Sequence, residues 1–586
     1  MLKLLKHLKS REWVMVGLSA VFMIAQVWLE LKIPDYMSRV TELVQTPGSA
    51  MGDVWLEGGK MLLCALGSVA TSVIIGCFAA KVASRFTHRL RAEIFDKVEA
   101  FSMEEINGFS TDSLITRSTN DITQIQMLVA MGLQVMIKAP VMAVWAVLKI
   151  AGKSWQWSAL TGGAVLFLAL MILFLMLYAL PRFKRIQGLT DNLNRVTREN
   201  LTGIRVVRAY NAEGYQEAKF EQANSELTRT TLEAHQAMNV MNPGMRIIMN
   251  GLTLGIYWIG AYLIDTAAGP DKIPLFSDMV VFTSYAMQVV MSFMMLMMIF
   301  IMLPRALVSA RRIREVLDTS PKILDGTRTD SPEGRTGEVE FRGVSFKYPD
   351  AEEYVLENIS FKAKKGETVA FIGSTGSGKS TLVNLVLRFY DAAEGQVLVD
   401  GVDVREYTQE ALHNKLGYVS QKAVMFSGTV SSNVAYGSSG RERPDEEDIR
   451  SAVRIAQGSD FVEKMEDGYQ SAIAQGGTNV SGGQKQRLSI ARAVCRKPEI
   501  YIFDDSFSAL DYKTDRSLRA ALKRETAGVT SLIVAQRIGT IKDADQIIVL
   551  DEGRMVGSGK HEELMESCEV YREIAYSQLS KEELGA

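Results

Sequence analysis

The sequence predicts an α-helical membrane domain of six transmembrane helices followed by a water-soluble α/β domain. Three observations support this fold class. Long apolar segments without charge occur only before residue 304, basic loops separate some of them, and the later part reads as β-branched strands, glycine loops and apolar helices. The mean hydropathy of +0.06 therefore averages two unlike halves.

The membrane domain is predicted from apolar segments that contain no charged residue. They are residues 13–29, 61–80, 154–180, 247–264 and 279–303. At a rise of about 1.5 Å per residue, roughly 20 apolar residues cross the hydrocarbon layer. A sixth segment is apolar apart from Lys138 and Lys149, and it is needed to join the second and third. We expect a membrane domain over 1–319, with spans at about 13–33, 57–80, 127–150, 154–180, 245–266 and 278–303.

The orientation is predicted from the basic residues in the loops. Residues 1–11 are cationic and amphipathic, which is typical of an interfacial helix on the cytoplasmic side rather than of a cleaved signal peptide. The long loops after the second and fourth spans are rich in Lys and Arg, and the short connections are not. We expect a multi-pass protein of the cell membrane with both termini in the cytoplasm.

Composition excludes several classes of partner. The 65 basic and 67 acidic residues give a formal charge of −2, too balanced for a nucleic-acid binder. The four cysteines form no CxxC pair, so neither a disulfide framework nor a zinc site is expected.

A linker rich in Gly, Pro, Asp and Thr is expected over 320–337, and the soluble domain over 338–586, with no further span.

A phosphate-binding loop is predicted near the start of the soluble domain. The segment GETVAFIGSTGSGKSTLVN reads as a strand, a glycine loop and a helix, and it contains the Walker A pattern. Glycines let backbone N–H groups surround phosphate oxygens, Lys379 neutralises phosphate charge, and the Ser380 hydroxyl suits Mg²⁺. The candidate ATP-binding residues of this α/β P-loop NTPase domain are Gly373, Ser374, Thr375, Gly376, Ser377, Gly378, Lys379, Ser380 and Thr381.

A second acidic motif completes the predicted site and points to a family. Residues 501–505 form an apolar strand ending in two carboxylates, the Walker B arrangement that puts Asp504 at the metal. Between the two motifs, residues 480–484 read VSGGQ and open a helix. This order of motifs resembles the ATP-binding cassette (ABC) transporters over about 337–564. Six spans and one cassette in one chain resemble a half-transporter of the type I/IV exporter class.

The resemblance implies cofactors and further site residues. ATP and Mg²⁺ would be bound, with Ser380, Gln421 and Asp504 on the metal side, and Tyr348 resembles the aromatic platform for adenine. The D-loop positions are Ser508 and Asp511. The signature that would cover the ATP of a second cassette is Val480, Ser481, Gly482, Gly483 and Gln484. Segments near 108–114 and 203–211 would be the coupling helices that dock on the cassettes.

Two positions depart from the family pattern. Asp505 stands where the family has a Glu that orients the attacking water, and Gln536 stands where it has a His. One reading is neutral drift with slow hydrolysis. The other is a site that binds MgATP but hydrolyses it poorly, in a heterodimer whose partner supplies the competent residues. Residues 475–479 add similarity to the degenerate-site subunits of bacterial heterodimeric multidrug exporters.

The transported substrate is only suggested by residues of the spans. Methionines recur on one face of the sixth span at Met287, Met291, Met294, Met298 and Met302. Such a polarizable wall suits varied hydrophobic ligands, although helix packing or lipid contact would explain it too. Lys138 is a candidate cavity residue or a snorkelling lysine. The main hypothesis is an exporter of hydrophobic drugs or lipid-like compounds; the alternatives are a dedicated lipid or peptide exporter and a nucleotide-sensing regulatory or channel subunit.

Overall fold

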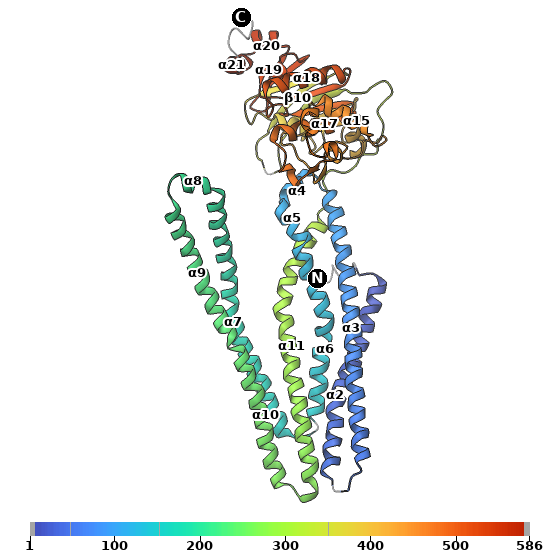
Figure 1. The fold of residues 1–586 in the computed structure, drawn as a ribbon, viewed down its shortest axis with the longest axis vertical. Helices are drawn as coiled ribbons and strands as arrows, with labels where there is room; N and C mark the ends of the chain where they lie inside the picture. The colour runs from blue at the N-terminus through green and yellow to red at the C-terminus, as the bar shows by residue number, and fades with distance from the viewer. Residues whose placement is uncertain (1–5, 7, 47, 152, 350, 579–586) are drawn as a thin grey trace. The chain divides into compact units, whose positions relative to one another are not determined.

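The computed structural model describes residues 6, 8–46, 48–151, 153–349 and 351–578. These residues form two compact units (Figure 1). One contains Met1–Lys97 and Asp112–Thr319, and the other contains Val98–Thr111 and Ser320–Ala586. The second unit therefore includes a short segment of the first long loop in addition to the soluble part of the chain. The expected N-terminal interfacial helix lies largely outside the described residues.

The first unit is helical. Its helices are α2 (Ser10–Gln45), α3 (Met51–Glu99), α5 (Thr111–Ser118), α6 (Asn120–Ala151), α7 (Trp155–Thr202), α8 (Ile204–Ala209), α9 (Glu213–Asn239), α10 (Met241–Thr266) and α11 (Lys272–Asp318), with a 3₁₀ turn at Gly269–Asp271. Six helical stretches among the described residues are long and apolar enough to cross a membrane. The six expected spans fall on them, and most of the helices continue well past the apolar part.

Helix packing in this unit follows two groupings. Helix α11 packs on α6, α10 and α2, while α7 runs along α9 and α10, as Figure 1 shows. The buried centre includes Trp157 and Phe282, whose ring centroids are 5.3 Å apart, and the Trp157 Nε1 donates to the Ile256 carbonyl at 3.2 Å. Large side chains such as Leu63 on α3 are exposed, as expected for a surface that faces lipid.

The second unit is built on two main sheets. A four-stranded antiparallel sheet has the order β2-β1-β4-β5, with β1 Val339–Phe346, β2 Leu356–Ala363, β4 Glu394–Val399 and β5 Val402–Asp403. A six-stranded sheet has the order β12-β11-β3-β10-β9-β6, with β3 Thr368–Gly373, β6 Leu416–Val419, β9 Ile500–Asp504, β10 Thr530–Val534, β11 Gln546–Asp551 and β12 Arg554–Gly559. All neighbours in the second sheet are parallel except β11 and β12.

Helices cover this sheet and form a separate lobe. The helices are α12 (Lys379–Val386), α13 (Gln409–Lys415), α14 (Val430–Val434), α15 (Glu446–Ile455), α16 (Ser459–Val462), α17 (Gly482–Cys495), α18 (Tyr512–Glu525), α19 (Ile538–Ile541), α20 (His561–Ser567) and α21 (Glu569–Gln578). The lobe of α14 to α17 has its own apolar cluster, in which Val434, Val453 and Leu488 are buried. Strands β7 (Gly428–Thr429) and β8 (Ala472–Ile473) pair beside it.

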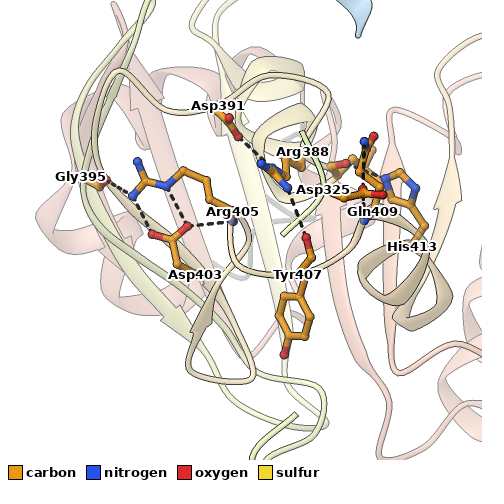
Figure 2. A network of polar contacts seen from close by, with 10 residues as sticks. Asp325, Arg388, Asp391, Gly395, Asp403, Arg405, Tyr407, Gln409 and His413 are labelled. Carbon is orange, nitrogen blue, oxygen red and sulfur yellow. Dashed lines mark hydrogen bonds and ion pairs between the residues drawn. The ribbon is translucent and has the colours of Figure 1, made fainter. Parts of the chain in front are cut away.

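The expected linker belongs to the second unit and is hydrogen-bonded to it. The Gly326 and Arg328 amides donate to the Tyr407 and Glu406 carbonyls, both at 2.9 Å. Figure 2 shows the neighbouring polar network, in which the Asp325 carboxylate accepts from the Gln409 amide at 2.9 Å. A Cβ on Gly326 would lie 2.0 Å from the Glu406 oxygen, so this close approach requires glycine. The composition of the segment indicated a linker but not this pairing.

Candidate nucleotide-binding site

The candidate site lies where parallel strands end. Strand β10 pairs with β3 on one side and β9 on the other, and Val534 at its end is opposite Phe371 and Asp504. The carboxyl ends of neighbouring parallel strands meet at one edge of a sheet, where ligands usually bind. The Walker A loop follows β3, the two acids end β9, Gln536 follows β10, and Gln421 follows β6. The topology therefore brings together motifs that are far apart in the sequence.

The phosphate loop wraps around its own lysine. The Lys379 Nζ donates to the carbonyls of Gly373 at 2.9 Å and Ser374 at 2.6 Å and to the Ser377 Oγ at 3.2 Å. Burial lowers the pKa of this amine. Ser374, Thr375 and Gly376 are exposed at the loop tip. The loop can therefore present its backbone N–H groups to a phosphate next to a lysine held in place.

Position 378 of the loop requires a glycine. Gly378 has φ +93° directly before α12, and an added Cβ would lie 2.6 Å from the Leu356 side chain and 2.9 Å from the Val355 carbonyl oxygen. Both the left-handed conformation and the close approach therefore exclude a side chain. This positions Lys379 and Ser380 as the first two residues of α12.

Two of the three candidate metal ligands, Ser380 and Asp504, lie in contact, whereas Gln421 donates to Asp505. The Ser380 Oγ donates to the Asp504 Oδ1 at 2.8 Å. Asp504 is 5% exposed, and burial raises the pKa of its carboxyl. Among the described residues no cluster of three His, Cys, Asp or Glu could hold a metal by itself. A hydroxyl beside one carboxylate nevertheless fits Mg²⁺, which commonly takes its other ligands from phosphates and water.

The two departures from the family pattern lie in direct contact. The Asp505 Oδ2 accepts a hydrogen bond from the Gln536 Nε2 at 2.9 Å and a longer one from the Gln421 Nε2 at 3.3 Å. Asp505 is 9% exposed and has φ +47°. Both of its side-chain donors are neutral amides, which neither accept nor release a proton near neutral pH. The sequence identified Asp505 and Gln536 as departures from the family pattern, and in the structure they are hydrogen-bonded to each other.

The candidate adenine platform is an aromatic cluster. Tyr348 contacts Phe346 and Tyr390 edge to face, with centroids 5.0 and 5.3 Å apart, and shares a 3.0 Å hydroxyl contact with Thr381 of the phosphate loop segment. The ring is partly exposed. Tyr348 is thus held beside the loop by the side chains around it, in keeping with a stacking role for a base.

The signature lies in the helical lobe, apart from the Walker A loop. Ser481 caps α17, since its Oγ accepts from the Gln484 amide at 3.3 Å while the Gln484 Oε1 accepts from the Ser481 amide at 2.8 Å. Val480 is buried, whereas Ser481 and Gly482 are exposed. In the described part of the chain no hydrogen bond joins Ser481, Gly482, Gly483 or Gln484 to residues 373–381.

The D-loop and the first coupling segment are also placed. The Ser508 Oγ donates to the Asp505 carbonyl at 3.0 Å, and Asp511 caps α18 by accepting from the Thr514 amide at 3.0 Å.

Helix α4 (Met103–Phe109) belongs to the second unit, where the Asn107 Nδ2 donates to the Tyr390 hydroxyl at 3.0 Å. This contact falls just before the expected segment 108–114. The other expected segment, 203–211, contains α8.

The structure adds acidic partners for the lysines within the spans, which the sequence analysis missed. Lys138 Nζ is 2.8 Å from Glu30 Oε1, and Gln26 and Ser68 donate to the same oxygen at 2.8 and 3.1 Å. Lys149 likewise pairs with an acid of α2, Asp35, at 2.7 Å. Glu30 falls directly after the first uncharged segment, but no sequence pattern links it to Lys138.

The methionine face is only partly described. Met291 and Met294 are exposed in this chain, Met287 is half-buried, and the side chain of Met298 lies outside the described residues. The exposed methionines show an apolar surface on α11 that packing within one chain does not cover.

Comparison with known proteins identifies the family. A model described as the ABC transporter transmembrane region matches residues 16–293, and one described as ABC transporter matches residues 356–508. An uncharacterized ABC transporter ATP-binding protein of Mycobacterium tuberculosis is 41% identical over 554 residues, 93% of each chain. One of Bacillus subtilis is 33% identical over 586 residues, 99% of each chain. The chain belongs to the ABC transporter family.

Two further matches refine this assignment. An ATP-dependent lipid A-core flippase of Pseudomonas fluorescens is 31% identical over 491 residues, 83% of this chain and 79% of the flippase. A solved bacterial Atm1-family ABC exporter with ATP bound shares the fold with a TM-score of 0.78 at 24% identity, over 97% of this chain and 99% of that one. The protein is a multi-pass membrane protein with the fold of an ABC exporter half-transporter, and its cassette implies ATP binding.

The raised pKa of Asp504 leads to a pH prediction. Mg²⁺ requires the ionised carboxylate, and burial makes Asp504 hold its proton to a higher pH than an ordinary Asp. We expect the Mg²⁺-dependent gain in ATP affinity to fall as pH is lowered, starting above the usual Asp range. Titrations of a fluorescent ATP analogue at each pH, with Mg²⁺ and with EDTA, measure this gain in affinity. Asp504→Asn should abolish the gain at every pH; an unchanged gain in that variant would contradict the assignment.

Proposed function

We propose that this chain is one subunit of an ATP-driven exporter, that it binds MgATP at a hydrolysis-impaired site, and that it supplies its signature to a competent site on a different half-transporter. The observation that carries this is the 2.9 Å hydrogen bond between the Gln536 amide and the Asp505 carboxylate. The two positions from which the family activates water are here occupied by a shorter acid and an amide that are bonded to each other.

The size of the expected defect follows from two effects. Asp is one methylene shorter than Glu, on the order of 1 Å of reach, and such a misplacement can cost about a hundredfold in rate. Loss of a group that exchanges protons costs typically about 10²- to 10⁴-fold. Lys379, Ser380 and Asp504 keep the arrangement that binding needs. Binding without efficient hydrolysis is therefore the function that this pocket favours.

The signature supports the second half of the proposal. Gly482 and Gly483 lie in the first turn of a 14-residue helix, where backbone N–H groups and the helix dipole attract anions. Gly482 is exposed, and an added Cβ would touch nothing within 4 Å. This open helix end suits a γ-phosphate held by the Walker A loop of another subunit. A heterodimer would thus have one competent pocket and one that mainly holds nucleotide.

The other coupling helix supports a partner as well. Helix α8 and its flanks carry exposed apolar side chains, with Val206 61% and Tyr210 79% exposed. Large exposed apolar groups of this kind commonly mark an interaction site. We assign this tip to docking on a cassette of the dimer. With the basic long loops inside, we place the termini and the cassette on the cytoplasmic side of the cell membrane.

The proposed substrates are hydrophobic drugs or lipid-like compounds taken from the cytoplasm or the inner leaflet. Met291 and Met294 supply a soft, adaptable surface on α11. Lys138 carries no uncompensated charge, because Glu30 neutralises it. A second candidate is a dedicated lipid exporter, which the relative named as a lipid A-core flippase favours.

Hydrolysis by this chain alone is the first test. In nanodiscs we expect slow phosphate release from the purified chain, and an increase of about 100-fold or more in Asp505→Glu with Gln536→His, because both groups that handle water are restored. Adding Lys379→Ala to the double variant should remove the gain. If the unaltered chain releases phosphate rapidly and Asp505→Asn abolishes that release, the proposal of an impaired site is wrong.

The signature is tested in the reconstituted pair. Gly482→Glu places a carboxylate where the partner's γ-phosphate would lie, without a clash inside this chain, so we expect ATP turnover of the pair to fall about 100-fold. Gly482→Ala is the matched control and should retain most of the turnover. Equal turnover in the Glu variant and the unaltered pair would show that this signature completes no competent site.

Substrate range is tested by stimulation of the same pair. We expect several unrelated hydrophobic drugs to raise its ATPase rate, and Met291→Ala with Met294→Ala to reduce that response by severalfold, since both side chains are exposed on α11. Leu62→Ala with Leu66→Ala, two exposed residues of α3, is the control and should leave it unchanged. Stimulation by one lipid class alone would instead support the dedicated lipid exporter.

A further inference from the structure

A basic cavity lies where the start of α2 meets α3. It has a volume of about 610 Å³, and all of its lining belongs to the first unit. The lining residues are Leu8, Lys9, Ser10, Arg11, Glu12, Arg85 and Arg89. Four cations and one carboxylate give the cavity a formal charge of +3. The nucleotide site and the methionine face lie on other segments and do not include any of these residues.

The one carboxylate of the cavity is already engaged. Glu12 Oε1 accepts from the Arg89 Nη1 at 2.7 Å, and the Lys9 amide donates to Glu12 Oε2 at 2.9 Å. The Glu12 side chain is 3% exposed and that of Arg89 21%. This buried pair fixes α2 against α3. Among the described residues that line the cavity, no second carboxylate is present for Lys9, Arg11 and Arg85.

The remaining cations are open to a ligand. Lys9, Arg11 and Arg85 are exposed, and no ion pair links any of them to a carboxylate in the described part of the chain. Two guanidinium groups and an ammonium around one open cavity match the oxygens of a phosphate, for which arginine supplies paired donors. The cavity chemistry therefore favours a singly or doubly charged anion rather than a neutral ligand.

The position of the cavity along α2 and α3 indicates where that anion comes from. The second uncharged segment ends at Ala80, and Arg85 and Arg89 follow by about 8 and 14 Å along α3 at roughly 1.5 Å per residue. Trp13, next to the cavity on α2, is 51% exposed, and tryptophan favours the headgroup level of a bilayer. Val14 beside it is 61% exposed and offers apolar surface to an acyl chain.

We propose that this cavity binds the phosphodiester headgroup of an anionic phospholipid of the inner leaflet. Arg11 and Arg85 hold the phosphate, the Glu12–Arg89 pair sets the spacing of α2 and α3, and the acyl chains lie along the exposed apolar residues of α2. The site is separate from transport of substrate and from nucleotide binding. The proposal depends on the cytoplasmic orientation of these helix ends and not on the state of the ATP site.

Native mass spectrometry of the full-length protein tests the proposal. The detergent-solubilised chain is titrated with phosphatidylglycerol and, separately, with phosphatidylcholine. We expect tighter binding of phosphatidylglycerol, and a loss of at least about tenfold in its affinity in Arg11→Gln with Arg85→Gln, because each contact of a basic residue with an anionic lipid contributes severalfold. These two residues lie outside the buried Glu12–Arg89 pair, so the helix packing is retained.

The matched control removes the same charge elsewhere. Arg91→Gln with Lys97→Gln lies on α3 but outside the cavity, and it should bind phosphatidylglycerol as the unaltered chain does. An equal loss in both double variants would mean that only overall charge matters, and no loss in the cavity variant would also overturn the site. Inorganic phosphate is the third probe. If it fills the cavity at micromolar concentration and phosphatidylglycerol does not compete, the ligand is a free phosphate and the lipid assignment is wrong.

Discussion

The parallel pairing of β10 between β3 and β9 is the constraint on which the candidate site depends. It brings the ends of three strands to one edge, so the Walker A loop, the two acids and Gln536 converge although more than 150 residues separate the first from the last. The strands hold this register because their side chains are buried, as Phe371, Ile502 and Leu532 show. A shift of one residue would move these side chains to the opposite face of the sheet and the acids away from Ser380.

A second constraint acts in the membrane unit, where charge must be neutralised. Lys138 and Lys149 on α6 each meet an acid of α2, Glu30 and Asp35, at hydrogen-bond distance. A lone charge in hydrocarbon is costly, and a paired one is much less so. These two contacts therefore fix both the rotation of α2 and its height relative to α6. They also make this wall of the helix bundle polar without giving it a net charge.

Much of this could be predicted from the sequence, because it depends on local signals. Apolar segments marked the spans, and the glycine loop and the acidic strand end marked the site, since residue type and spacing alone define them. Contacts between distant segments could not be predicted in this way. Neither the pairing of Glu30 with Lys138 nor that of Gly326 with Tyr407 has a sequence pattern, and each depends on how whole elements pack. The contact between Asp505 and Gln536 was expected as a shared pocket, and the structure supplies the hydrogen bond.

The way Lys379 is held has a consequence for which molecules can enter the loop. An ammonium has three N–H donors, and here all three directions meet oxygens of the chain itself, at Gly373, Ser374 and Ser377. A ligand must replace those oxygens to bind the Lys379 Nζ. Sugars and amides offer no stronger acceptors than the carbonyls already present, whereas a polyphosphate tail does. The contacts of Lys379 therefore favour a triphosphate over a bare nucleoside as the ligand of this loop.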